Sequence, residues 1–247
     1  LLMGLLAVFI VYPILQVIYV AFTQDGALTA DHFLNFFERD LFQEALLNSL
    51  FAGLMAVIVG SAIGLPLAFI SVKYDFPGRS LIQTLGVLPL VIPPFVGAIA
   101  LQLVLGRSGV LNLMMLRWFG TTIPFMEGLA GVVIVQSLHY FPFILLNASA
   151  SLSNVDPSLE EMGQNLGAHG FRLFRKITFP LMMPGYIAGA LLVFIKTVDD
   201  LGTPLMLNYT SMLAPQAYLR ITNIGYEDKA GYVIAVIMVL LSLVALW

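Results

Sequence analysis

Long apolar runs dominate this chain of 247 residues and restrict it to folds that cross a lipid bilayer. A spanning helix needs about 20 mostly apolar residues. Six segments meet that need, the last of them slightly short: Leu1 to Phe22, Ala45 to Val72, Leu81 to Leu105, Gly128 to Leu152, Leu181 to Leu207 and Gly231 to Trp247. Strands of membrane barrels instead alternate over about ten residues. The sequence therefore predicts an all-α integral membrane protein with six transmembrane helices in a single domain, residues 1–247.

Composition supports this class and excludes several kinds of site. The chain is 60% hydrophobic and 10% charged, whereas soluble domains are about half apolar and a quarter charged. It has no cysteine, which excludes disulfides and thiolate metal sites. His32, His139 and His169 are too scattered along the chain to predict a metal site. Both ends fall inside apolar runs, so we expect a longer chain that was trimmed at both ends.

The third span contains Pro89, Pro93 and Pro94. Each proline removes a backbone donor that lipid cannot replace, so such a helix breaks where protein or a water-filled path satisfies the freed carbonyls. Two interpretations remain open. The segment is either a bent helix that lines a substrate path or an ordinary proline kink within the helix bundle.

The fifth span carries charges close to its end. Lys196 precedes Asp199 and Asp200 by three and four residues, which predicts that all three share a helix face, and Gly202 and Pro204 follow. Each charge costs about 2.5–3.5 kcal/mol at the centre of a bilayer on insertion scales. The group is either a polar face that lines the path or its outer gate, or a local ion pair near the interface.

A more polar segment, about residues 153–180, separates the fourth and fifth spans. Asp156-Pro157 is typical of a helix N-terminus, and Gly167 and Gly170 bracket a predicted tight turn. Apolar residues recur at helical spacing on both sides of the turn. We therefore expect two short amphipathic helices at an angle, with Pro180 leading into the next span. Lys and Arg are denser in the loops on the same side of the membrane as this segment than in the longer loops on the other side. This density favours a cytoplasmic location for the segment, although the two sides have equal numbers of basic residues.

The spacing of Glu161, Gly167, Ile177 and Pro180 resembles the EAA loop of the membrane subunits of binding-protein-dependent ABC importers. A basic amphipathic hairpin of this kind could instead lie on anionic lipid. That role does not require a glycine at a fixed distance from a glutamate, so a partner-docking hairpin is favoured. Met162 and Gly163 stand where the family has two alanines, which predicts a weaker first helix and an intact turn.

The resemblance extends beyond the loop. The segment LPLVIPPFVGAIA followed by GRSGVLN is similar to the branch that handles ferric iron, phosphonates, thiamine, sulfate and polyamines. VDDLGTPLML, Val198 to Leu207, most resembles the ferric-iron permeases, which are often two fused copies of this unit. The resemblance thus implies ferric iron as the first expected substrate, with the others behind it, and a chain that is one half of a fused permease as one alternative.

The resemblance also implies a type I importer permease in the bacterial inner membrane and a set of partners. These are ATP-binding cassette subunits that carry ATP and magnesium, a second permease unit (identical, homologous or fused), and a periplasmic or lipid-anchored binding protein. We expect no cofactor in this chain and no nucleic acid.

The resemblance further assigns residues to two regions. The ATPase-coupling loop comprises Glu160, Glu161, Gly167, Ala168, His169, Gly170, Phe171, Ile177 and Pro180. The path or gate comprises Pro89, Pro93, Pro94, Lys196, Asp199, Asp200, Gly202 and Pro204.

Other function classes fit less well. The sequence has no P-loop, so the chain does not itself hydrolyse ATP. An ion-coupled secondary transporter or channel would use the same kinked spans and buried charges, but it has no need of a docking hairpin. A structural scaffold would not need the broken third span or the acidic pair.

Overall fold

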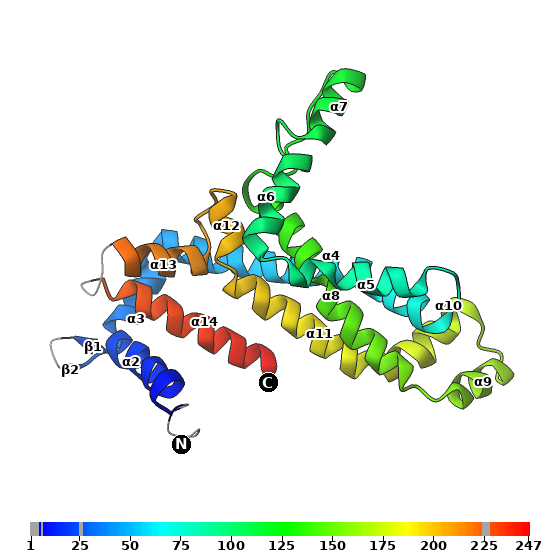
Figure 1. Ribbon diagram of the computed structural model, residues 1–247. Helices are drawn as coiled ribbons and strands as arrows, with labels where there is room; N and C mark the ends of the chain where they lie inside the picture. Colours follow the sequence, from blue (N-terminus) through cyan, green and yellow to red (C-terminus); the bar gives the residue numbers. More distant parts are fainter. Residues whose placement is uncertain (1–4, 6, 25–26, 224–227) are drawn as a thin grey trace. The chain divides into compact units, whose positions relative to one another are not determined.

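The computed structural model describes residue 5 and residues 7–24, 27–223 and 228–247. Residues 1–4 and 6 of the predicted first span lie outside this part. The chain divides into two compact units, residues 52–197 and a second unit of residues 1–51 with 198–247. Helices dominate both units (Figure 1).

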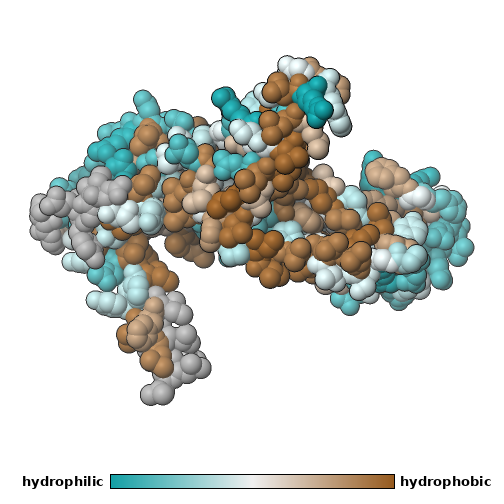
Figure 2. Space-filling model, turned by 45° about the horizontal axis from the view of Figure 1, so that its top comes forward, coloured by the Kyte–Doolittle hydropathy of each residue, from teal (hydrophilic) through white to brown (hydrophobic). Residues whose placement is uncertain are grey.

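Four helical stretches are long and apolar enough to cross a membrane: 40–73, 94–119, 128–153 and 170–199. Three shorter apolar helices cover 7–21, 79–91 and 230–246. Together they occupy all six predicted spans, which confirms the helical membrane class. Figure 2 shows the consequence, because apolar side chains cover long continuous stretches of the surface, as lipid-facing helices require.

The unit of residues 52–197 is built around the most deeply buried helix, α8. Its helices in chain order are α4 (Asp40–Lys73, which begins in the other unit), α5 (Arg79–Val91), α6 (Pro94–Leu105), α7 (Val110–Phe119), α8 (Gly128–Ser153), α9 (Pro157–Asn165), α10 (Gly170–Leu173), the π-helix η2 (Phe174–Thr178) and α11 (Phe179–Asp199, which ends in the other unit). Helices α6 and α7 extend away from the bundle of α5, α8 and α11 (Figure 1).

Glycines let the neighbouring helices approach α8 closely. A Cβ atom on Gly64 of α4 would lie 3.1 Å from Ile144, and one on Gly189 of α11 would lie 2.8 Å from the Ile144 backbone. On α5, a Cβ at Gly86 would meet Leu145 at 2.6 Å. Small residues serve this purpose in membrane helix packing, because lipid supplies no hydrophobic force between helices and close contact must replace it.

The predicted third span is broken, as its prolines indicate. Helix α5 ends at Val91, Ile92 is extended, and Pro93 precedes the first residue of α6. Pro89 is accommodated inside α5, so the break lies at Ile92 and Pro93, and Pro94 begins α6. Proline at the start of a helix costs little, since the amide it lacks has no partner there.

A buried asparagine on α7 holds the turn before this helix and the segment after it. The Asn112 side chain accepts a hydrogen bond from the Ile123 amide at 2.8 Å and donates to the carbonyls of Gly106 and Ile123, each at 2.9 Å. These bonds satisfy the carbonyl of Gly106, which follows the last residue of α6, and both backbone groups of Ile123, which lies beyond the end of α7.

The unit of residues 1–51 and 198–247 has its own core. Its elements are η1 (Ala7–Val11), α2 (Tyr12–Ala21), β1 (Thr23–Gln24), β2 (Ala27–Leu28), α3 (Asp31–Glu38), the start of α4, α12 (Gly202–Met206), α13 (Leu213–Asn223) and α14 (Ala230–Leu246). The two strands form a minimal antiparallel pair that the sequence did not predict. Phe36 and Phe42 stack at 5.3 Å inside the core, and the Ser49 hydroxyl accepts from the Leu213 amide at 2.9 Å.

Candidate coupling site

The first arm of the coupling loop is helix α9, which begins where the sequence predicts. Pro157 occupies its first turn, and the Asp156 carboxylate accepts a hydrogen bond from the Ser158 amide at 2.9 Å. This bond lowers the pKa of Asp156 below its ordinary value. The cap satisfies one of the free amides at the start of the helix.

The predicted glycine turn is confirmed. Gly167 and Gly170 have φ angles of +84° and +53°, in the left-handed region that favours glycine. The Gly167 amide donates to the Gln164 carbonyl at 2.9 Å and the Ala168 amide donates to the Gly163 carbonyl at 3.0 Å. These are the two bonds of a Schellman motif, which closes α9 and fixes the direction in which the chain leaves it.

The second arm differs from the prediction of a separate short helix. Helical backbone runs without interruption through residues 170–199, so α10 and η2 are the first turns of the fifth spanning helix. Pro180 lies inside this stretch, just beyond a π-turn in which the Phe179 amide donates to the Phe174 carbonyl. Proline cannot donate to the carbonyl four residues earlier. The local change to π geometry accommodates that missing bond without ending the helix.

Gly163 joins the two arms. A Cβ atom at this buried position would overlap Cδ1 of Ile177 and lie 3.0 Å from Cδ1 of Leu173. Sequence reasoning treated Gly163 as a weakness of the first helix. The structure shows that the missing side chain instead makes room for Ile177, which lies in η2.

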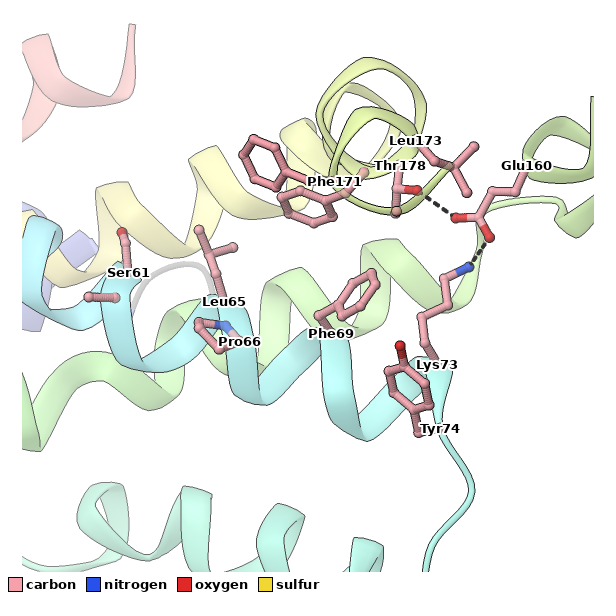
Figure 3. Close-up of a pocket in the computed structure, with 13 residues that line it drawn as sticks. Ser61, Leu65, Pro66, Phe69, Lys73, Tyr74, Glu160, Phe171, Leu173 and Thr178 are labelled. Atoms are coloured by element: carbon pink, nitrogen blue, oxygen red, sulfur yellow. Dashed lines mark hydrogen bonds and ion pairs between the residues drawn. The ribbon is translucent and has the colours of Figure 1, made fainter. Parts of the chain in front are cut away.

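Glu160 connects the loop to helix α4. Its carboxylate accepts hydrogen bonds from Lys73 Nζ at 2.6 Å and from Thr178 Oγ1 at 2.7 Å (Figure 3). The side chain of Glu160 is only 15% exposed, whereas Glu161 is exposed. The two neighbouring glutamates therefore have different surroundings. Lys73 was not predicted as a site residue, because no local spacing links positions that are 87 residues apart.

An apolar groove of about 690 Å³ lies between α4 and the second arm, and the three bonded side chains are at one end of it (Figure 3). It is lined by Ser61, Ala62, Leu65, Pro66, Phe69, Lys73, Tyr74, Glu160, Gly170, Phe171, Leu173, Phe174 and Thr178. The rings of Phe69 on α4 and Phe174 on η2 meet edge to face at 5.3 Å and so join the two sides of the groove.

The tip of the loop exposes apolar side chains. Leu166 is 89% exposed and Phe171 is 73% exposed, and His169 beside them is exposed as well. This end of residues 52–197 is otherwise largely hydrophilic (right in Figure 2). Apolar side chains grouped within a polar surface mark sites of protein interaction.

The predicted path residues lie in several places. Pro89 lines a cavity of about 260 Å³ beside Gly97 and His139. Lys196 belongs to the unit of residues 52–197, while Asp199, Asp200, Gly202 and Pro204 belong to the other unit.

The expectation that Lys196, Asp199 and Asp200 share a helix face is wrong for Asp200, because α11 ends at Asp199. The buried Asp200 carboxylate instead accepts from the amides of Gly202 at 2.9 Å and Thr203 at 3.2 Å. It therefore caps the first turn of α12. Within the described part of the chain, no three histidine or acidic side chains are grouped to hold a metal ion.

Comparison with known proteins identifies the family. Residues 56–247 match the model of the binding-protein-dependent transport system inner membrane component. The chain belongs to this family. It is therefore an ABC importer permease, a membrane subunit whose ATPase is a separate chain.

Relatives and solved structures agree with this assignment. A probable molybdenum ABC transporter permease protein of Haloferax volcanii is 30% identical over 95% of this chain and 83% of that protein. The molybdenum transport system permease protein ModB of Escherichia coli K12 is 30% identical over 82% and 90% of the two chains. A putative ferric transport system permease protein, FbpB 1 of Haemophilus influenzae, is 27% identical over 95% of this permease and 38% of its own length.

The fold also matches solved importers. A bacterial ABC transporter involved in the import of the acidic polysaccharide alginate aligns with a TM-score of 0.77 at 20% identity, over 98% of this permease and 88% of that chain. The MetNI methionine ABC transporter aligns with a TM-score of 0.61 at 18% identity. The predicted type I importer permease fold is thereby confirmed.

Proposed function

We propose that this permease forms a substrate path together with a second permease unit and couples it to ATP-binding cassette subunits through residues 153–180. The observation that carries the proposal is the exposed turn at Gly167, which projects from two arms that pack closely at Gly163. ATP and magnesium bind the partner subunits, and a periplasmic or lipid-anchored binding protein delivers the substrate.

Coupling through such a loop requires contacts that differ between the states of the ATPase. Leu166, His169 and Phe171 are exposed and available to a partner cleft, so we assign docking to the turn. Glu161 is exposed beside it and joins this surface. Glu160 and Ile177 face inward, so we assign them to holding the loop together.

For the substrate path, we propose the break at Pro93 and Pro94 and the adjacent cavity that Pro89 lines. A discontinuous helix at membrane depth is tolerated where protein or a water-filled space satisfies the backbone. The segment of Asp200, Gly202 and Pro204 is a second candidate, because it begins where the fifth spanning helix ends.

For the substrate, we propose a tetrahedral oxyanion of molybdenum or tungsten, with ferric iron as the second candidate. Relatives named for molybdenum, and a molybdate/tungstate transport system permease protein of Thermococcus kodakarensis, support the first, and this permease spans 83–90% of the length of the two molybdenum relatives. The segment from Val198 to Leu207 and the ferric relatives support the second. The binding protein, a separate chain, does most of the selecting in this family.

The test is uptake by the intact transporter, purified with its partners and reconstituted in liposomes. We expect ATP-dependent uptake of labelled molybdate that excess unlabelled tungstate suppresses, and no uptake driven by an ion gradient alone. ATP-dependent uptake of ferric iron without uptake of molybdate would reverse the order of substrates. Gradient-driven uptake in the absence of any ATPase would instead support a secondary transporter.

A further inference from the structure

The hydrogen bonds of Glu160 with Lys73 and Thr178 lie inside the protein, away from the exposed docking turn. They join three elements through one carboxylate: Lys73 is the last residue of α4, Glu160 lies in α9, and Thr178 is the last residue of η2. We refer to these three residues as the tether. We propose that the tether positions the coupling loop on α4, so that movement of the docked loop is transmitted to the second spanning helix.

The burial of the tether supports this role. The side chains of Lys73 and Glu160 are 23% and 15% exposed, and Thr178 is buried. A charged hydrogen bond in such surroundings is stronger and less screened by salt than one at the surface. By contrast, the ion pair of Arg79 with Asp75 has side chains that are 39% and 94% exposed.

The groove beside the tether explains why a polar contact is needed here. About 690 Å³ of space lies between α4 and the second arm, so direct packing between them is limited along the groove. The edge contact of Phe69 with Phe174 joins α4 to the second arm, but it does not involve α9. The packing of Gly163 against Ile177 holds the two arms to each other, but it does not reach α4. The tether thus fixes α9 to α4 at the end of the groove.

This inference rests on the proposed function, and the experiment separates the two. The complete transporter is purified and reconstituted with its binding protein, first with the unaltered chain and then with Lys73→Met, Glu160→Gln, Thr178→Val, Lys73→Arg and the exchange Lys73→Glu/Glu160→Lys. Arg79→Gln serves as a matched control, because it removes a cation from an exposed ion pair. Two quantities are measured for each: the ATPase that co-purifies, and the substrate molecules transported per ATP hydrolysed.

We expect Lys73→Met and Glu160→Gln to retain the ATPase, because the docking turn is unchanged. We expect transport per ATP to fall by about 5- to 150-fold, the usual range of a coupling between sites. Lys73→Arg and the control should stay close to the unaltered chain, and the exchange should recover much of the loss. A merely structural role would lower the yield of the complex without changing transport per ATP in the complexes that form.

The tether is refuted if both single variants transport as much substrate per ATP as the unaltered chain, or if the exchange is no better than the weaker single variant. Should Lys73→Met fail to assemble, Thr178→Val decides, because it removes one neutral hydrogen bond. Thr178→Val should lower the substrate transported per ATP while the same amount of ATPase co-purifies. Unchanged transport per ATP overturns the proposal. Failure of the unaltered chain to bind an ATPase refutes the proposed function instead.

Discussion

Adding one carbon atom at Gly163 tests how the two arms of the coupling loop are held together. Alanine favours a helix over glycine by about 1 kcal/mol, so Gly163→Ala would stabilise an isolated α9. In the folded loop the new Cβ would overlap Cδ1 of Ile177, the end of a side chain that must shift to make room. Overpacking of this kind costs about 1–3 kcal/mol. We therefore expect a net loss of roughly 0–2 kcal/mol in the stability of the loop.

A second substitution isolates the cause. Valine lacks Cδ1, so Ile177→Val removes the nearer of the two atoms that the alanine would meet and leaves Cδ1 of Leu173, at 3.0 Å. By itself it should cost about 0.5–1.5 kcal/mol. In the double variant the alanine should stabilise α9 as it would in an isolated helix. The double variant should therefore be more stable than the sum of the two single effects predicts, by an interaction energy of about 0.5–3 kcal/mol.

The assay is amide hydrogen exchange of residues 157–165 in lipid nanodiscs, which reports the free energy of local opening. Exchange should be faster in Gly163→Ala than in the unaltered permease. In the double variant it should be slower than the sum of the two single-variant effects would give. The reasoning is refuted if Gly163→Ala slows exchange by the full helical advantage of about 1 kcal/mol and Ile177→Val does not alter that effect.

Three further substitutions test other parts of the account. Gly167→Trp places a side chain at φ +84° in open space, which costs about 1–2 kcal/mol locally; we expect normal membrane insertion with loss of transport, and full transport with full ATPase stimulation would contradict the docking assignment. Gly189→Leu would drive a side chain into the backbone at Ile144, since even a Cβ would lie 2.8 Å from it. The free energy of unfolding should fall by about 1–3 kcal/mol, which is measured as a lower melting temperature in detergent. An unchanged melting temperature would contradict the close packing of α11 on α8. Asn112→Ala leaves the Ile123 amide unsatisfied and should cost about 1–3 kcal/mol; faster exchange of that amide is the expected signal, and unchanged protection would show that Asn112 does not hold the segment after α7.

Much of the fold follows from local sequence rules. The apolar runs predict spanning helices because lipid requires internal backbone hydrogen bonding. Pro93 and Pro94 predict the broken third span, and Asp156 with Gly167 predicts the limits of α9. Each of these features depends on residues that are close together along the chain.

The features that the sequence did not predict depend on distant contacts or on backbone adjustment. Lys73 meets Glu160 across 87 positions, which no local pattern reports. Pro180 was expected to mark a helix boundary, but a π-turn absorbs its missing donor. Gly163 was interpreted by helix propensity alone, whereas its contact with Ile177 decides its role. The end of α11 at Asp199 places Asp200 in a cap rather than on a shared polar face.

The most direct test of the central claim is cross-linking from the tip of the loop. The chain has no cysteine, so Leu166→Cys provides a single reactive site at a position that is 89% exposed. A photoactivated thiol reagent attached there should cross-link, in native membranes, to a protein with a P-loop, and the yield should change when ATP is added. The same reagent at Phe119→Cys, an exposed position at the end of α7, should not reach that protein. Cross-linking to lipid alone from Leu166→Cys, or equal cross-linking from both positions, would contradict the account.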